Sequence, residues 1–323
     1  MNRRIVQEYV EGKFPGFTAK WSKAYSYRNS KIFIFGLQMD KIQEKIVVKM
    51  SHNFDPRQVA LEFENLSRFF QGCKDPRISS PKPLFVDPEE GILAMRYVDG
   101  TNLSYMLHEI KPVSRKCQNH FVDISAIALA RFHNIFSWPK DEPFRIGNIL
   151  QEDDINKCIA ESKELIDDCN LSLKVTPFFD FTPWNIIVEN GSNKICLIDF
   201  PRQDYVYTPH LDLARFRFSL ELAKQFPPAK FFGINRWDVD QLFDRFLSGY
   251  CHEMQVKPNR DDLWLIGSFR KANIRRAQDL ARKGKYGLQP RLEKAYLQTF
   301  SREWLDQKGI FAQWPRIGKA KEA

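Results

Sequence analysis

The sequence predicts an α+β protein of two lobes, a small antiparallel sheet with one helix followed by a mainly helical lobe. Short β-branched and aromatic runs dominate residues 1–98, as is typical of strands. Apolar residues at helical spacing dominate residues 99–323. A pair of apolar runs within residues 178–200 interrupts the helical lobe and predicts a strand hairpin. The character of the chain changes at Tyr97 to Thr101, which is the predicted boundary.

The composition indicates a folded globular chain. The 323 residues include 27 Phe, 10 Tyr and 7 Trp, which is ample for a sizeable core. No stretch approaches the roughly 18 uninterrupted apolar residues of a transmembrane helix, and the basic N-terminal segment lacks the apolar region of a secretory signal. The 6 cysteines are scattered without a C-x-x-C pair, which fits neither a zinc site nor a disulfide framework. These features predict a cytoplasmic protein.

The first lobe is predicted to start with a helix or ordered arm, Met1 to Phe17, and to continue as a meander of strands. The predicted strands are Ala19 to Tyr25, Lys31 to Leu37, Lys45 to Met50, Pro81 to Val86 and Ile92 to Tyr97. The first three should pair antiparallel, with Lys49 on the third. A helix should begin at Asp55 or Pro56 and end at Gly72, because apolar side chains recur there at helical spacing.

The second lobe is predicted to be helical apart from the hairpin. The candidate helices are Asn102 to Glu109, Ser114 to Phe136, Asp153 to Cys169, Leu211 to Gln225, Val239 to Met254, Arg260 to Lys283 and Leu288 to Gln307. No internal repeat or low-complexity linker separates them.

Three oxygen-bearing side chains flank the predicted hairpin. Its apolar runs, Ile186 to Val188 and Ile195 to Ile198, are joined by a polar segment with an Asn-Gly turn signal. If the runs pair, Asn185 at the start of one comes close to Asp199 at the end of the other, and Asp180 precedes Asn185 in a loop bent by Pro183. Hard oxygen ligands suit Mg²⁺, which takes few protein ligands and completes its shell with water and phosphate oxygens. The hairpin is therefore a candidate magnesium site.

The formal net charge of +9 is concentrated in one stretch near residues 269–294. Its basic residues include Arg270, Lys271, Arg275, Arg276, Arg282, Lys283 and Lys285. Two interpretations stay open. The stretch is either a solvated helix face or a binding surface for an anionic partner, which could be a phosphorylated molecule or a membrane surface. Nucleic acid is disfavoured, because no aromatic–basic interleaving or nucleic-acid motif accompanies the charge.

The order of these elements resembles the protein kinase-like fold, and more closely the aminoglycoside phosphotransferase and choline kinase-like family. The family signature is roughly H-G-D-F-x-P-x-N-I-L-V, then I-D-F/W, then D-L-A. This chain reads FFDFTPWNIIV from Phe178, LIDF from Leu197 and DLA from Asp212, with matching spacing inside each block. The FTPWN variant is similar to members found with cell-surface polysaccharide genes. The resemblance covers about Ala19 to Tyr250.

This resemblance implies ATP and Mg²⁺ as cofactors and a role for each matching residue. Asp180 would accept the proton of the attacking hydroxyl, and Asn185 and Asp199 would hold Mg²⁺. Lys49 would contact the α- and β-phosphates. The carboxylate holding that lysine would be Glu62, with Glu64 as the competing candidate.

Further positions match the nucleotide-binding and supporting parts of the family. The resemblance places Arg96, Tyr97 and Val98 in the hinge whose backbone faces the adenine. It makes Asn29 and Ser30, in the loop from Ser26, the donors to phosphate. It also makes Asp212 the brace of the catalytic loop, while an alternative from the residue alone is a plain helix N-cap. His133 is expected to be a core histidine.

The chain departs from the family pattern at three places. Phe178 and Phe179 stand where the family has His and Gly, the phosphate loop has no glycine, and Pro201 follows Phe200 where protein kinases have Gly. The main hypothesis is an ATP- and Mg²⁺-dependent phosphotransferase acting on a hydroxyl of a small molecule or glycan. The alternative is a catalytically impaired pseudokinase that binds a nucleotide or a partner.

Overall fold

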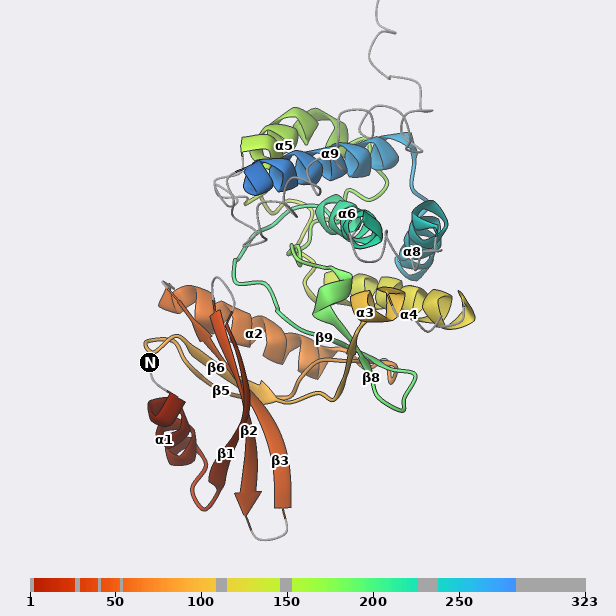
Figure 1. Ribbon diagram of the computed structural model, residues 1–323. Helices are drawn as coiled ribbons and strands as arrows, with labels where there is room; N and C mark the ends of the chain where they lie inside the picture. The colour runs from red at the N-terminus through yellow and green to blue at the C-terminus, as the bar shows by residue number, and fades with distance from the viewer. Residues whose placement is uncertain are drawn as a thin grey trace, which may run out of the picture. The chain divides into compact units, whose positions relative to one another are not determined.

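The chain forms two compact units, one rich in strands and one helical (Figure 1). The first comprises Met1–Thr101 and Ile187–Asp204, and the second comprises Asn102–Ile186 and Tyr205–Ala323. The structure is a computed structural model that describes residues 3–26, 30–39, 42–52, 55–108, 115–145, 153–225 and 238–282.

A five-stranded sheet in the order β1-β2-β3-β6-β5 makes up most of the first unit. Its strands are β1 (Thr18–Ser26), β2 (Ser30–Met39), β3 (Ile42–Ser51), β5 (Pro83–Asp87) and β6 (Ile92–Arg96). Every pair of neighbours in this sheet is antiparallel. Ile46 and Val48 alternate along β3 onto one face, where they are buried with Phe33 and Phe35 of β2. The predicted meander is confirmed.

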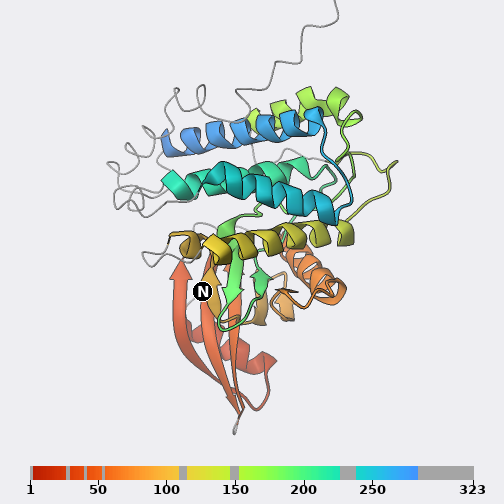
Figure 2. The same cartoon turned by 90° about the vertical axis from the view of Figure 1, so that its right-hand side faces the viewer.

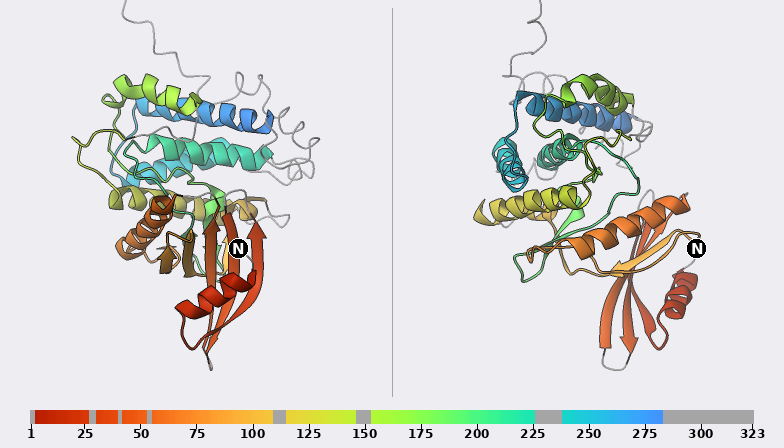
Figure 3. Two further views of the ribbon diagram at one scale, coloured as in Figure 1. Left: turned by 90° about the vertical axis from the view of Figure 1, so that its left-hand side faces the viewer. Right: turned by 180° about the vertical axis from the view of Figure 1, so that it is seen from behind.

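Two helices complete the core of this unit. In α1 (Arg3–Lys13), Val6 and Val10 lie one turn apart and pack against the same buried face of the sheet (Figure 3). Helix α2 (Pro56–Gly72) begins as predicted, because the Asp55 side chain accepts a hydrogen bond from the Arg57 backbone N–H. Its buried residues recur at spacings of three and four and include one carboxylate, Glu62.

The predicted hairpin belongs to a second sheet, in the order β4-β9-β8-β7. Its strands are β4 (Ile78–Ser79), β9 (Ile195–Leu197), β8 (Ile186–Glu189) and β7 (Gly100–Asn102). Gly191 supplies the φ of +70° that the turn between β8 and β9 requires. Because β9 pairs with β4, most of the hairpin joins the first unit, whereas the sequence division placed it in the helical lobe. Strands β4 and β7 were not predicted, since two or three residues show no alternation.

The second unit is built from packed helices. They are α3 (Leu103–His108), α4 (Arg115–Ile135), α5 (Asp153–Ile166), the short 3₁₀ helix η2 (Pro183–Asn185), α6 (His210–Gln225), α8 (Val239–Glu253) and α9 (Arg260–Arg282). Helix α4 packs on α8, and α9 packs on both α5 and α6 (Figure 2). The helix predicted at Leu288 to Gln307 lies outside the described residues. Among the described helices, none has the length and apolar character needed to cross a membrane.

The basic stretch on α9 is only partly a surface. Arg270 is buried, and its Nε donates to Glu221 of α6 at 2.8 Å. Glu221 also accepts a hydrogen bond from the buried Arg217 at 3.2 Å. Lys271 and Arg275 are exposed. Arg270 therefore does not belong to the predicted surface for an anionic partner, and that surface stays a prediction.

Gly100 lies where β7 passes close to the backbone of β8. A Cβ at this position would lie 2.3 Å from the carbonyl oxygen of Val188, a backbone atom that cannot rotate away. We expect Gly100→Ala to lower the free energy of unfolding by about 1–3 kcal/mol, measured by urea denaturation. Gly12→Ala in α1 is the matched control, because its Cβ would meet nothing within 4 Å and should add about 0.5–1 kcal/mol of helix propensity. Equal stabilities of the two variants would contradict this account.

Candidate functional site

Lys49 lies between two carboxylates within the first unit. Strand β3 turns its side chain to the face opposite Val48, where the Nζ atom lies 2.5 Å from Oε1 of Glu62 on α2 and also contacts Oδ1 of Asp199. Lys49 and Glu62 are buried, while the Asp199 side chain is 43% exposed. Glu64 is exposed. The structure thus selects Glu62 over Glu64 as the partner of the lysine.

The ammonium of Lys49 and the carboxylates around it stabilise one another in their charged forms. Burial by itself would lower the pKa of Lys49, but the carboxylates of Asp199 and Glu62 outweigh it and hold that pKa above its ordinary value. Burial would likewise raise the pKa of Asp199, but the ammonium of Lys49 holds it below its ordinary value. All of these shifts favour the charged forms near neutral pH. Asp199 also has a φ of +62°, a strained backbone conformation that is often found at functional sites.

Glu62 has a second cationic partner, Arg202, which no sequence motif indicated. The Nε of Arg202 lies 2.8 Å from Oε2 of Glu62, while Oε1 of the same carboxylate holds Lys49. Arg202 follows Asp199 by three residues and has no counterpart in the family signature. Its position after the second apolar run of the hairpin was the only signal that could have drawn attention to it.

The residues predicted to face the nucleotide base lie at the end of β6. Arg96 donates its backbone N–H to Lys82, and Tyr97 donates its own to Lys45, both at 2.9 Å. Those two N–H groups are therefore already bonded, one to β3 and one to the residue before β5. The contact of Arg96, Tyr97 and Val98 with adenine stays a prediction. Ser30 is the buried first residue of β2. Asn29 lies outside the described residues.

Asp180 and Asn185 meet within the second unit. Pro183 begins η2, which brings the Asn185 side chain back over the loop. The Nδ2 of Asn185 donates to the backbone oxygen of Asp180 at 2.9 Å and to its Oδ2 at 3.0 Å. The amide orientation leaves Oδ1 of Asn185 as the oxygen that a cation would use. The Asp180 side chain is 47% exposed, so it can reach a ligand.

Asp180 also contacts Arg215, a residue of α6 that no sequence motif indicated. Nη2 and Nε of Arg215 donate to Oδ1 of Asp180 at 2.8 and 3.2 Å. Nη1 donates to Oδ1 of Asn273 on α9 at 3.1 Å. Arg215 follows Asp212 by three residues, so the turn of α6 that carries one also presents the other.

Asp212 is buried and fixes the backbone of the loop that precedes Asp180. Its two carboxylate oxygens accept the N–H groups of Phe178 and Phe179, each at 2.7 Å. His133 of α4 lies with Nε2 3.0 Å from Asp212 and Nδ1 2.8 Å from the hydroxyl of Tyr250. Asp212 thus makes the contacts of the predicted brace rather than those of a plain N-cap, and His133 is a hydrogen-bonded core residue, as expected.

The two phenylalanines before Asp180 differ in their roles. Phe178 is buried, and its ring centroid lies 4.9 Å from that of Phe132, so packing supports the loop where the family has histidine. Phe179 has a φ of +65°, and the Asp180 N–H donates to the Phe178 carbonyl at 2.8 Å across it, which forms a γ-turn. This conformation suits glycine, the residue the family carries at this position.

Glycine and alanine at position 179 should differ in stability, because the backbone φ there is +65°. Phe179→Ala removes the ring contact with Tyr205 and keeps the strained φ, whereas Phe179→Gly removes the same contact and relieves the strain. In the Gly variant, loss of the backbone strain should stabilise the folded state by about 1–2 kcal/mol. The greater freedom of glycine in the unfolded chain offsets part of this gain. Thermal and urea unfolding should show the Gly variant more stable than the Ala variant by about 0.5–1 kcal/mol. An Ala variant of equal or greater stability would contradict the strain at this position.

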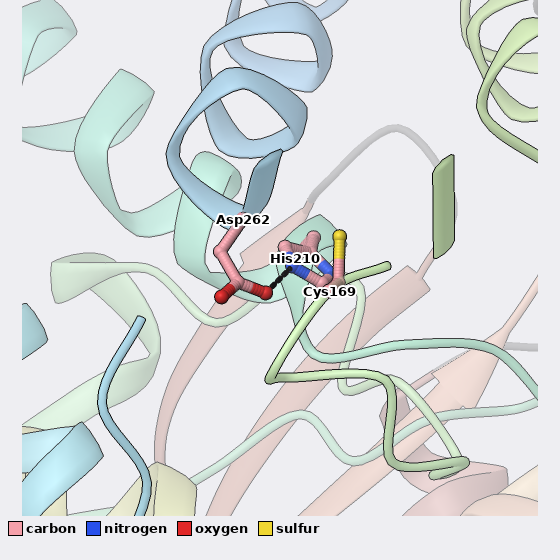
Figure 4. Close-up of side chains that lie close together, drawn as sticks. All are labelled: Cys169, His210 and Asp262. Atoms are coloured by element: carbon pink, nitrogen blue, oxygen red, sulfur yellow. Dashed lines mark hydrogen bonds and ion pairs between the residues drawn. The ribbon is translucent and has the colours of Figure 1, made fainter. Parts of the chain in front are cut away.

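One further cluster, Cys169, His210 and Asp262, connects the segment after α5 to the starts of α6 and α9 (Figure 4). Its ligand atoms all lie within 4.8 Å of one another, as a metal site would require. However, Asp262 already accepts hydrogen bonds from His210 at 3.0 Å and from three backbone N–H groups, those of Leu171, Asn170 and Asn259. Burial raises the pKa of the Cys169 thiol to about 12. The cluster therefore has a structural role, which we call the joint: its hydrogen bonds hold α6, α9 and the segment after α5 together.

Compared by sequence, the chain matches no protein-family model and no curated protein. Solved structures do match it. One is spectinomycin phosphotransferase APH(9)-Ia in complex with ADP and spectinomycin, with 13% identity, a TM-score of 0.55 and coverage of 93% of this chain and 94% of that one. Another is a putative aminoglycoside phosphotransferase from Ralstonia eutropha JMP134, with 13% identity, a TM-score of 0.55 and coverage of 93% and 97%.

These likenesses extend over nearly the whole of each chain and concern the fold. Together with the antiparallel sheet of the first unit and the helices of the second, they confirm the predicted α+β, protein kinase-like fold. The link to polysaccharide-cluster members of the family stays a prediction.

Proposed function

We propose that this chain is an ATP- and Mg²⁺-dependent phosphotransferase that phosphorylates a hydroxyl of a small molecule or glycan. The observation that carries the proposal is Lys49 buried between Glu62 and Asp199. A buried lysine held by one fully buried carboxylate and one half-exposed carboxylate has little structural purpose, since apolar residues would stabilise such a position as well or better. The arrangement suits a cation that must be fixed in place to receive phosphate oxygens.

The residues fit magnesium by their chemistry. Asp199 offers an ionised and half-exposed carboxylate, and Asn185 offers an amide oxygen that its own hydrogen bonds leave available. Mg²⁺ prefers such hard oxygen ligands and is commonly bound through one or two of them together with substrate phosphates. When bound, the ion would neutralise charge on the phosphates during transfer.

Asp180 is the proposed partner of the attacking hydroxyl. Its half-exposed carboxylate can accept the hydrogen bond of an acceptor hydroxyl and orient the oxygen towards the γ-phosphate. Asp212 supports this role, because it fixes the backbone of the two residues that precede Asp180. The proton of the hydroxyl passes to Asp180 as the new oxygen–phosphorus bond forms, while the bond between the γ-phosphorus and the β,γ-bridging oxygen breaks and ADP leaves.

The acceptor is proposed to be neutral or anionic. Spectinomycin is the ligand named for one structural neighbour. A polycationic acceptor such as an aminoglycoside would call for acidic residues around the acceptor site. Here Arg215 balances the charge of Asp180, and Lys271 and Arg275 are exposed on α9 of the same unit. This balance favours a hydroxyl compound such as a sugar, including a sugar of a glycan.

A catalytically impaired nucleotide-binding protein is the second candidate. The observation that favours it is the Phe178-Phe179 pair, with its strained φ directly ahead of Asp180. Against it, Phe178 is packed in the core, and both backbone N–H groups are bound by Asp212. The two candidates share nucleotide binding and differ in turnover.

Nucleotide binding is tested by thermal unfolding with and without ATP and Mg²⁺. A nucleotide present at about 100 times its dissociation constant should add about 2.7 kcal/mol to the stability of the folded state. Asp199→Asn should remove most of that gain, whereas Asp167→Asn, which changes an exposed carboxylate in the turn after α5, should keep it. A wild-type protein that gains nothing from millimolar ATP and Mg²⁺ would refute the proposal.

A further inference from the structure

Arg215 and Asn273 form a hydrogen-bonded relay to Asp180 that no motif of the sequence indicated. Each of the three nitrogens of the Arg215 guanidinium donates within this relay, two to Asp180 Oδ1 and one to Asn273 Oδ1. Asn273 is buried, and its Nδ2 donates to the Phe269 carbonyl of its own helix at 2.9 Å. That bond turns Oδ1 of Asn273 towards Arg215 and fixes the side chain.

The two carboxylate oxygens of Asp180 accept different numbers of hydrogen bonds. Oδ1 accepts both hydrogen bonds from Arg215, and Oδ2 accepts one from Asn185. A carboxylate oxygen has about two lone pairs, so Oδ2 retains the capacity to accept one more hydrogen bond. The half-exposed Asp180 therefore presents a single oxygen, in a fixed direction, to an incoming hydroxyl.

We propose that Arg215 is a positioning residue of the transfer reaction, with Asn273 of α9 as its support. This inference rests on the proposed phosphotransfer function. The guanidinium holds the carboxylate in one rotamer and balances its charge, so Oδ2 of Asp180 directs the acceptor oxygen. Charge-assisted pairs of this kind are shorter and stronger than neutral hydrogen bonds, which makes the orientation firm.

Removal of the Arg215 guanidinium should change the rate of phosphate transfer and not the affinity for the nucleotide. Of the residues proposed to hold Mg-ATP, Lys49, Glu62 and Asp199 belong to the first unit. Asn185 belongs to the second unit with Asp180, but the hydrogen bonds of Arg215 go to Oδ1 of Asp180 and that of Asn185 goes to Oδ2. Loss of the guanidinium should thus slow transfer and leave the dissociation constant for ATP with Mg²⁺ unchanged within about twofold. A role confined to stability would instead lower the melting temperature and leave the rate of the folded fraction unchanged.

The experiment measures single-turnover loss of the γ-phosphate from Mg-ATP, with water as the acceptor, in the full chain. We expect Arg215→Ala to slow this step about tenfold or more, as for loss of a residue that orients a reacting group. Free guanidinium ion should restore part of the lost rate in Arg215→Ala and none in the wild type. Asn273→Ala should act in the same direction with a smaller effect, and it keeps the inference testable if Arg215→Ala does not fold.

Ser219→Ala is the control for disturbance of α6. The Ser219 hydroxyl donates to the Arg215 backbone carbonyl at 2.7 Å, so its loss alters the same turn without touching the guanidinium. Its rate should equal that of the wild type. A wild-type rate in Arg215→Ala, or a slow Arg215→Ala that guanidinium does not rescue, would overturn the inference alone. Absence of turnover in the wild type would overturn the proposed function, and the inference with it.

Discussion

Replacing Asp180 by Asn should slow phosphoryl transfer by about 100-fold or more while Mg-ATP still binds. The amide has the shape of the carboxylate, so the γ-turn at Phe179 and the contacts of Asp212 with the loop should persist. What the amide cannot do is take the proton of the attacking hydroxyl. Single-turnover loss of the γ-phosphate measures the rate, and calorimetry with a non-hydrolysable ATP analogue measures the affinity.

Asp167→Asn provides the control for this substitution. Asp167 is an exposed carboxylate of the same unit, so it undergoes the same chemical change away from the loop. Its rate should match that of the wild type. If Asp180→Asn transferred phosphate as fast as this control, Asp180 could not be the residue that receives the proton.

Replacing Asp262 by Ala should destabilise the second unit by at least about 3 kcal/mol, because several buried donors lose their acceptor. Asp262 accepts hydrogen bonds from three backbone N–H groups as well as from the buried His210. Asp261→Ala is the matched control at the adjacent position. It removes an acidic residue of the same first turn of α9 and should cost at most about 1 kcal/mol. Urea unfolding of both variants measures the difference, and equal losses would contradict the proposed joint.

The stabilisation by Asp262 should depend on pH in a definite direction. Burial alone would raise the pKa of this carboxyl, but hydrogen bonds from His210 and from the Asn259 and Leu171 backbone hold it below its ordinary value. A carboxyl with a lowered folded-state pKa stabilises the protein fully above its unfolded-state pKa of about 4 and loses that effect as the pH falls further. The stability difference between wild type and Asp262→Ala should therefore be constant from pH 6 to 8 and shrink below about pH 4.

Local patterns sufficed for much of the fold and part of the site. Apolar runs predicted the five strands of the first sheet and placed Lys49 on the third of them. The polar turn predicted the β8–β9 hairpin. The resemblance pointed to Glu62 as the partner of Lys49, with Glu64 as the competing candidate, and the structure pairs Lys49 with Glu62 and leaves Glu64 exposed.

Other features depend on packing between distant segments and left no local signal. Arg215 is 35 residues from Asp180 in the chain, and its contact is set by how α6 lies beneath the loop. His210 and Asp262 are 52 residues apart and meet only because α6 and α9 begin at the same place. Strand β4 has two residues and exists because β9 pairs with it. The strained φ at Phe179 was signalled only indirectly, by a phenylalanine where the family has glycine.

The central claim is that the chain transfers the γ-phosphate of ATP, and turnover tests it most directly. The measurement is conversion of ATP to ADP by the purified full chain under single-turnover conditions, with ATP radiolabelled on its γ-phosphate. We predict conversion with Mg²⁺ that stops on addition of EDTA and in Asp199→Asn, and that slows by about 100-fold or more in Asp180→Asn. A wild-type protein that binds Mg-ATP but makes ADP no faster than Asp180→Asn would contradict the claim and leave a nucleotide-binding protein without transfer activity.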